Sequence, residues 1–173
     1  MKKIGQSSLG KSLRDQIFKL IETQSISHDQ IIRALAECRN YYIDQAVLEK
    51  IAKESGYKLS NFQTNQFLEL FYDISKGRYD IGYISKGWKD PGYRIGNILA
   101  IPSVRMRALQ DCILKIMNIC AVRGFSTTIM DKKDYAELHI DAVAYTEGFN
   151  QKVFVHMVEN LNECVEKTYE LLR

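Results

Sequence analysis

The sequence predicts an α+β fold, in which an antiparallel sheet is covered by helices. Two observations lead to this class. Hydrophobic residues repeat with a helical period in the first third of the chain, and from about Tyr79 they alternate in strand-like segments. The helical period then returns after Pro102 and again after Asn150. The expected order is N-terminal helices followed by α-β-β-α-β-β-α from residue 61 onward.

The helical first third has recognisable starts and stops. A first helix is expected from about Leu13 to residue 23. The next begins at Ser27-His28-Asp29-Gln30, which is a capping box. A third helix with apolar positions from Ile43 to Ala52 is expected to end at Gly56, and a fourth is expected over Phe62 to Ile74.

The rest of the chain alternates between strand and helix signals. Tyr79–Tyr83 and Tyr93–Ile101 are expected to form an antiparallel hairpin, with "KDPG" as a turn signal between them. A helix follows Pro102 and is broken by Gly124. A second hairpin, 125–145, leads to a last helix capped by Asn150, with Phe149 and Phe154 spaced as a hydrophobic staple.

Composition indicates a globular chain in three parts. We expect a flexible tail at 1–11, a helical part at 12–60 and an α+β domain at 61–173, packed as one unit. Of the 173 residues, 46% are hydrophobic, the formal net charge is +3, and no apolar run approaches membrane-span length. The four cysteines form no C-x-x-C pair, and Cys112, Cys120 and Cys164 occupy apolar helix positions. We expect a reduced, cytoplasmic protein without a disulfide framework or cofactor.

The N-terminus contains the letters of a phosphate-binding loop, G-x-x-x-x-G-K-[ST], at Gly5, Gly10, Lys11 and Ser12. A working loop of this kind lies between a buried strand and a helix, whose backbone N–H groups hold the phosphate. The few residues before Gly5 are too short for that strand. We therefore interpret the motif as a chance match, with Ser12 as a helix cap, and expect no nucleotide site.

The stretch "LEKIAKESGYKLSNF" resembles a helix-turn-helix DNA-binding element, with Gly56 at the turn. Its second helix would present Lys58, Ser60, Asn61, Gln63 and Thr64, whose side chains can bond base edges or phosphates. The alternative is an α-hairpin with a glycine stop, which the scarcity of Arg and Lys favours, because phosphate contacts supply much of the affinity for DNA.

An aromatic and basic surface is expected on the first hairpin. Tyr83, Trp88, Lys89, Tyr93 and Arg94 are the candidate partner-binding residues, with Trp88 as the apolar anchor and Arg94 as the polar one. Such side chains dominate protein interfaces and also stack on single-stranded nucleic acid. We take a protein partner as the first hypothesis and a nucleic-acid-binding regulator, using 47–66 and the basic hairpin 78–94, as the alternative.

No enzyme signature was found. Glu137, His139 and Asp141 share one face of an alternating strand, and such residues can bind a metal or act in acid–base catalysis. The solvent face of a strand gives the same pattern without function. We expect a non-enzymatic protein with neither a metal site nor catalytic residues.

The C-terminal part resembles a known family. "NILAIPSVRMRALQDCILKIMN", "RGFSTTIMDKKDYAELHIDAVAYTEG" and the closing helix are similar in element order to the YbjN family and, more broadly, to the type III secretion chaperone-like fold. The resemblance implies an adaptor or chaperone that binds proteins, often as a dimer. The helical first third and the basic charge depart from it. The order is also similar to vinyl-reductase-like domains, which would imply ligand sensing, but their cysteine pattern is missing.

Overall fold

The computed structural model describes residues 15–16, 18–19, 22–23, 27–61, 69–87 and 90–173. The chain divides into two compact units, Met1–Asp44 and Gln45–Arg173. Helix α2 (His28–Glu54) runs through this division, so the helices expected before and after residue 40 are one helix. The strands begin at Lys58.

The start of α2 confirms the predicted capping box. The Ser27 N–H donates to Gln30 Oε1 at 2.9 Å, and the Gln30 N–H donates to Ser27 Oγ at 3.3 Å. These reciprocal bonds satisfy two backbone donors that a helix N-terminus otherwise leaves without partners.

The unit Gln45–Arg173 contains an antiparallel sheet of six strands, which confirms the α+β class. The strands are β1 (Lys58–Asn61), β2 (Glu69–Lys76), β3 (Tyr79–Gly87), β4 (Gly92–Pro102), β5 (Ser126–Asp131) and β6 (Tyr135–Tyr145). Their order across the sheet is β1-β2-β3-β4-β6-β5. Both predicted hairpin regions are therefore antiparallel pairs, β3 with β4 and β5 with β6.

The prediction of a helix over 62–74 is wrong for its second part. Residues Glu69–Lys76 form β2, which pairs along its whole length with β3. Leu70, Tyr72 and Ile74 are buried on one side of this strand. The apolar spacing of the segment fits both the helical period and the two-residue period of a strand. Pairing with two neighbouring strands selects the extended form.

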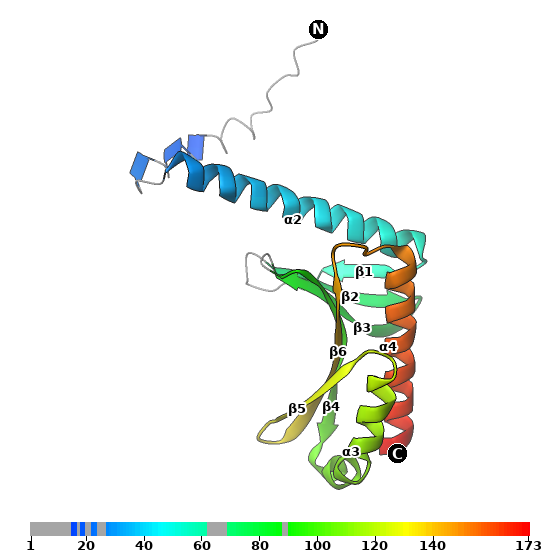
Figure 1. The fold of residues 1–173 in the computed structure, drawn as a ribbon. Coiled ribbons are helices and arrows are strands. Elements are labelled where there is room, and N and C mark those ends of the chain that lie inside the picture. Colours follow the sequence, from blue (N-terminus) through cyan, green and yellow to red (C-terminus); the bar gives the residue numbers. More distant parts are fainter. Residues whose placement is uncertain (1–14, 17, 20–21, 24–26, 62–68, 88–89) are drawn as a thin grey trace. The chain divides into compact units, whose positions relative to one another are not determined.

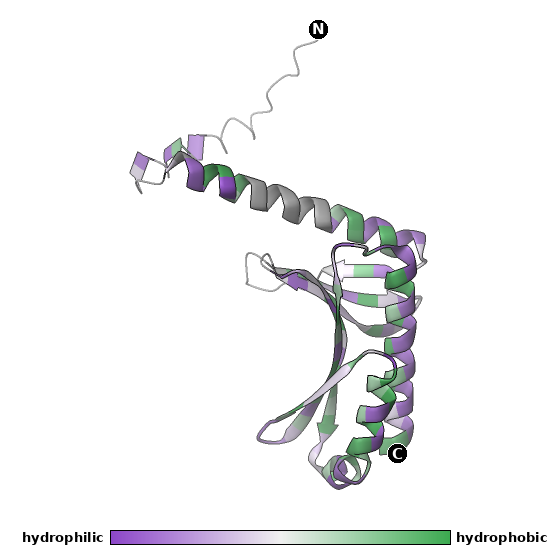
Figure 2. Cartoon of the chain, viewed as in Figure 1, coloured by the Kyte–Doolittle hydropathy of each residue, from purple (hydrophilic) through white to green (hydrophobic). Residues whose placement is uncertain are grey.

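Two helices cover one face of the sheet. After a short 3-10 turn, η1 (Ser103–Arg105), come α3 (Met106–Ala121) and later α4 (Gln151–Leu172), which lie side by side (Figure 1). Hydrophobic and hydrophilic residues alternate along both helices (Figure 2), as expected when one side of a helix is covered. The core between helices and sheet contains fully buried side chains from every layer: Ile84, Ile95, Leu109, Ile116, Leu138, Ile140, Phe154, Val158 and Leu161.

Predicted details of α4 and of the cysteines are confirmed. The Asn150 side chain accepts the N–H groups of Lys152 and Val153, and the rings of Phe149 and Phe154 meet edge to face at 6.4 Å. Cys112, Cys120 and Cys164 are free and buried. A hydrogen bond with the Cys164 thiol and burial raise the pKa of Cys120, which favours its neutral thiol form.

None of the helices in the described ranges is both long and apolar enough to cross a membrane.

Candidate functional site

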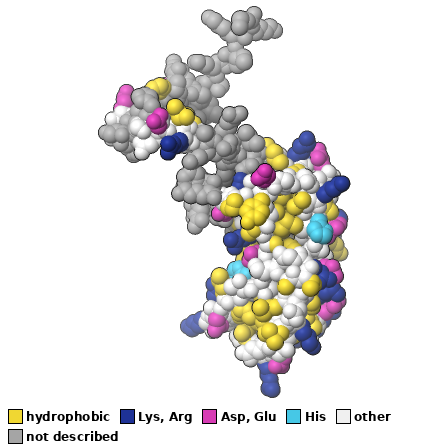
Figure 3. Space-filling view, viewed as in Figure 1, with side chains coloured by type: hydrophobic (Ala, Val, Ile, Leu, Met, Phe, Trp, Pro, Cys, Tyr) yellow, Lys and Arg dark blue, Asp and Glu magenta, His cyan; other side chains and the backbone are white. Residues whose placement is uncertain are grey.

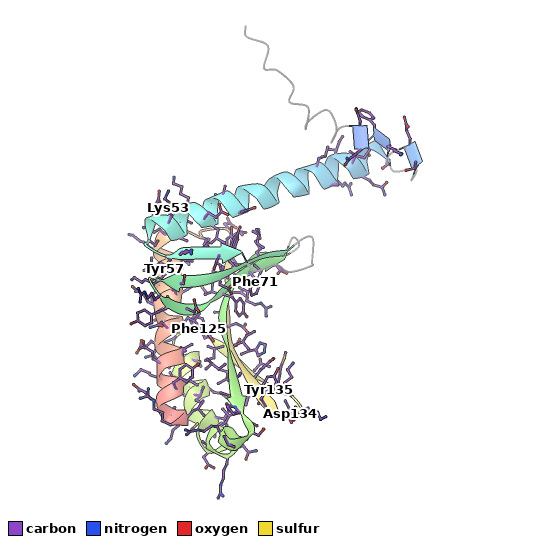
Figure 4. The ribbon with its side chains drawn as sticks, turned by 180° about the vertical axis from the view of Figure 1, so that it is seen from behind. Lys53, Tyr57, Phe71, Phe125, Asp134 and Tyr135 are labelled. Carbon is purple, nitrogen blue, oxygen red and sulfur yellow. The ribbon has the colours of Figure 1, made fainter. Side chains whose placement is uncertain are left out.

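The sheet face opposite α3 and α4, here called the open face, carries the polar and aromatic side chains of the strands. Side chains alternate between the two faces of a strand, so the register assigns each position. The open face comprises Phe71 and Asp73 on β2, Tyr83 and Ser85 on β3, Arg94, Gly96, Ile98 and Ala100 on β4, Ser126, Thr128 and Met130 on β5, and Glu137, His139, Asp141 and Val143 on β6. In Figure 4, Phe71 lies near one end of the sheet and Tyr135 near the other.

Two of the predicted partner-binding residues lie together on this face. Tyr83 is half-buried, and its ring stacks on that of Phe71 with the centroids 5.3 Å apart. Arg94 lies on the neighbouring strand, opposite Ser85, with its side chain 54% exposed. Its guanidinium is 3.9 Å from the Asp141 carboxylate, which orients it across the face.

Tyr93 is not part of this surface. It is 2% exposed, and its ring centroid is 4.5 Å from that of Phe149 on the helix side of the sheet. The prediction that Tyr93 contacts a partner is wrong, because the residue points into the core. Trp88 and Lys89 lie outside the described residues.

The helix-turn-helix interpretation is also wrong. Gly56, with φ of 75°, ends α2 as predicted, but Lys58, Ser60 and Asn61 follow in β1, paired with β2. A strand at this position leaves no recognition helix to start near Leu59. Gln63 and Thr64, like Gly5, Gly10, Lys11 and Ser12 of the phosphate-loop motif, lie outside the described residues.

The acidic and histidine residues of β6 fall into two separate groups, one around Glu137 and one around Asp141. His139 Nε2 lies 3.2 Å from Glu137 Oε2, and Lys132 Nζ lies 3.3 Å from the same oxygen. The bond with His139 and the Lys132 charge lower the pKa of Glu137. Asp141 pairs with Arg94 instead. Among the described residues, no three His, Cys, Asp or Glu side chains lie close enough to hold a metal ion.

A depression of about 380 Å³ opens beside Tyr83, bordered by Phe71, Asp73, Asp80 and Asn97 among others. Burial and the nearby Asp80 carboxylate raise the pKa of Asp73. The depression lies where β3 and β4 separate, a feature that the sequence analysis did not anticipate.

The pairing of β4 shows how far this separation extends. β4 pairs with β6 from Gly92 to Pro102 but with β3 only at Gly96, Ile95 and Arg94. Beyond Gly96, Asn97 Nδ2 bridges the two strands by donating to the Ile81 carbonyl at 2.7 Å. β3 also has a β-bulge at this point, because Ile74 and Ser75 pair with Gly82 and Asp80, leaving Ile81 as an extra residue. Beyond Gly96, the sheet therefore separates into β1-β2-β3 and β4-β6-β5, which stay paired at Arg94, Ile95 and Gly96.

On the helix side, the division continues as a groove along α4. One depression, of about 560 Å³, is lined by Tyr79 and Ile81 of β3 and by Val158 and Val165 of α4. A second, of about 470 Å³, is lined by Ala100 and Ile101 of β4. Both are lined by Glu166 and Tyr169, so they lie next to each other along α4.

Comparisons with known proteins show the fold and nothing more specific. No family model matches the chain. No curated protein matches it either. Among solved structures, it is similar to an uncharacterized protein from Methanothermobacter thermautotrophicus, with 11% identity and a TM-score of 0.60, over 74% of this chain and 95% of that one.

Proposed function

We propose that the chain is a non-enzymatic protein-binding module whose contact surface is the open face around Tyr83 and Arg94. The observation that supports this most directly is the arrangement of Tyr83 and Arg94. A half-buried aromatic ring and an exposed guanidinium lie on adjacent strands, each held by a neighbour, Phe71 or Asp141. Rigid aromatic and arginine side chains of this kind are typical interface anchors, since little entropy is lost when they bind.

The element order from Gly92 onward supports an adaptor or chaperone-like role. Strand, helix, hairpin and helix follow one another there, which is the order on which the resemblance to the type III secretion chaperone-like fold was based. The buried free thiols fit a reducing compartment such as the cytosol.

The test compares two matched arginines. The chain is immobilised, captured proteins are identified by mass spectrometry, and the affinity for a purified partner is then measured. Arg94→Ala and Tyr83→Ala are each expected to weaken binding about 30-fold, corresponding to about 2 kcal/mol. Arg107→Ala, exposed on α3, is expected to leave binding unchanged.

Equal affinity of all variants would contradict the assignment of the surface. Binding to random duplex or single-stranded DNA that falls steeply with salt would replace the proposal with the nucleic-acid-binding alternative.

A further inference from the structure

Backbone groups of β4 face the division of the sheet and have no ladder partner among the described residues. The Gly96 carbonyl points toward β3, since a Cβ added at Gly82 would come within 2.2 Å of it. In an antiparallel strand every second residue points its N–H and C=O the same way. The N–H and C=O groups of Ile98 and Ala100 therefore also point toward β3, which no longer pairs there.

The residues along this edge are not covered on the open face. Ile98 is 47% exposed and Ala100 is exposed. Across the division Tyr79, at the start of β3, is 80% exposed. Free strand edges in native proteins are usually covered or paired, because unsatisfied ladder groups pair readily with another chain.

The groove beside this edge has the composition of a peptide site. Its floor is made by the apolar side chains of Val158 and Val165 and by the ring of Tyr169. Its charged residues are four acidic ones, Asp80, Glu159, Glu166 and Glu170, and three basic ones, Lys76, Arg105 and Arg173. The Arg105 guanidinium is already bonded to the carbonyls of Leu172 and Arg173. Figure 3 shows acidic and basic side chains on the surface of this unit, with hydrophobic ones gathered between them.

We propose that the division between β3 and β4 accepts an extended peptide as an added strand, paired with the Ile98 and Ala100 backbone. The peptide alternates apolar side chains, which enter the groove along α4, with lysine or arginine side chains, which meet its carboxylates. Main-chain bonds give such complexes affinity and the alternate side chains give specificity. The inference rests on the proposed function and specifies the kind of partner segment.

The test uses a labelled octapeptide of alternating lysine and valine and the full chain. Peptide binding is followed by fluorescence anisotropy, and amide hydrogen exchange at Ile98 and Ala100 is followed by NMR. We expect the peptide to slow exchange at both amides at least about tenfold. The same peptide N-methylated at alternate residues, and a glutamate–valine octapeptide, are expected not to bind.

A matched charge reversal locates the site. Glu166→Lys is expected to weaken the lysine–valine peptide about tenfold. Glu147→Lys, the same change at an exposed residue outside the groove, is expected to change affinity by less than about twofold.

Three results would overturn the inference: protection of Ile98 and Ala100 in the free chain, no binding of the lysine–valine peptide, or binding that leaves both amides unchanged. A partner that needs Tyr83 and Arg94 but does not protect these amides would leave the proposed function standing and exclude the added strand. A partner whose binding needs neither Tyr83 and Arg94 nor the Ile98 and Ala100 edge would contradict both the proposed function and the added strand.

Discussion

Asn97 links the two parts of the sheet beyond Gly96, and its removal tests this description. Its side-chain N–H donates to the Ile81 carbonyl at 2.7 Å in a partly buried position. A hydrogen bond of this kind contributes about 1 kcal/mol net, so Asn97→Ala is expected to lower the free energy of unfolding by about that amount. For a unit of this size the Tm then falls by about 3 °C. Asn97→Asp is expected to cost more, about 2 kcal/mol, because a carboxylate cannot donate to the carbonyl that it faces.

The matched control is an asparagine on α4. Asn162 Nδ2 donates to Glu166 Oε1 on the exposed side of α4, and such helix-surface pairs contribute only about 0.3 kcal/mol. Urea unfolding should rank the variants Asn97→Asp, Asn97→Ala and Asn162→Ala, from least to most stable. An Asn97→Ala protein as stable as the wild type would refute the bridging role. Faster amide exchange in Asn97→Ala should be confined to the β3–β4 junction.

Variants at three further positions test separate parts of the structure. Asp73→Asn is expected to be more stable than wild type at pH 7 and equal to it below about pH 3. The raised pKa of Asp73 makes its ionisation unfavourable in the folded state, so this carboxyl group costs stability as pH rises. Urea unfolding at both pH values checks this, and a less stable variant at pH 7 would contradict it. Asn150→Ala is expected to cost about 1 kcal/mol through loss of the α4 cap, whereas Asn150→Asp retains the acceptor and should unfold at nearly the same temperature. Thr168→Val is expected to change the free energy of unfolding by less than about 0.5 kcal/mol, since it removes only a hydrogen bond to the Cys164 carbonyl. Thr168→Ala also creates a cavity and is expected to cost about 2 kcal/mol in urea unfolding.

The fold class and the strongest local signals could be predicted from the sequence because they depend on short-range patterns. The capping box at Ser27, the staple of Phe149 and Phe154 and the alternation in β4 and β6 each specify local structure. The segment Glu69–Lys76 could not be assigned in this way. Its apolar residues suit a helix face or a strand face, and only its neighbours β1 and β3 select the strand.

The candidate site was predicted in part. Arg94 was expected at the surface and is exposed, whereas the burial of Tyr93 had a signal that was overlooked. Because side chains alternate along a strand, Tyr93 lies on the same side of β4 as Ile95, Leu99 and Ile101, all of which are core residues. The division between β3 and β4 has no short-range signal. It depends on the register of strands distant in sequence, on the bulge at Ile81 and on the Asn97 bridge.

The division of the sheet is tested most directly by amide hydrogen exchange along β4 in the free chain. The amides of Leu99 and Ile101 point toward β6 and are expected to exchange slowly, while those of Ile98 and Ala100, which have no ladder partner in the described part of the chain, are expected to exchange quickly. Alternating fast and slow amides beyond Gly96 would confirm the free edge. Uniformly slow exchange along β4 would contradict it, and with it the site assigned to an added strand.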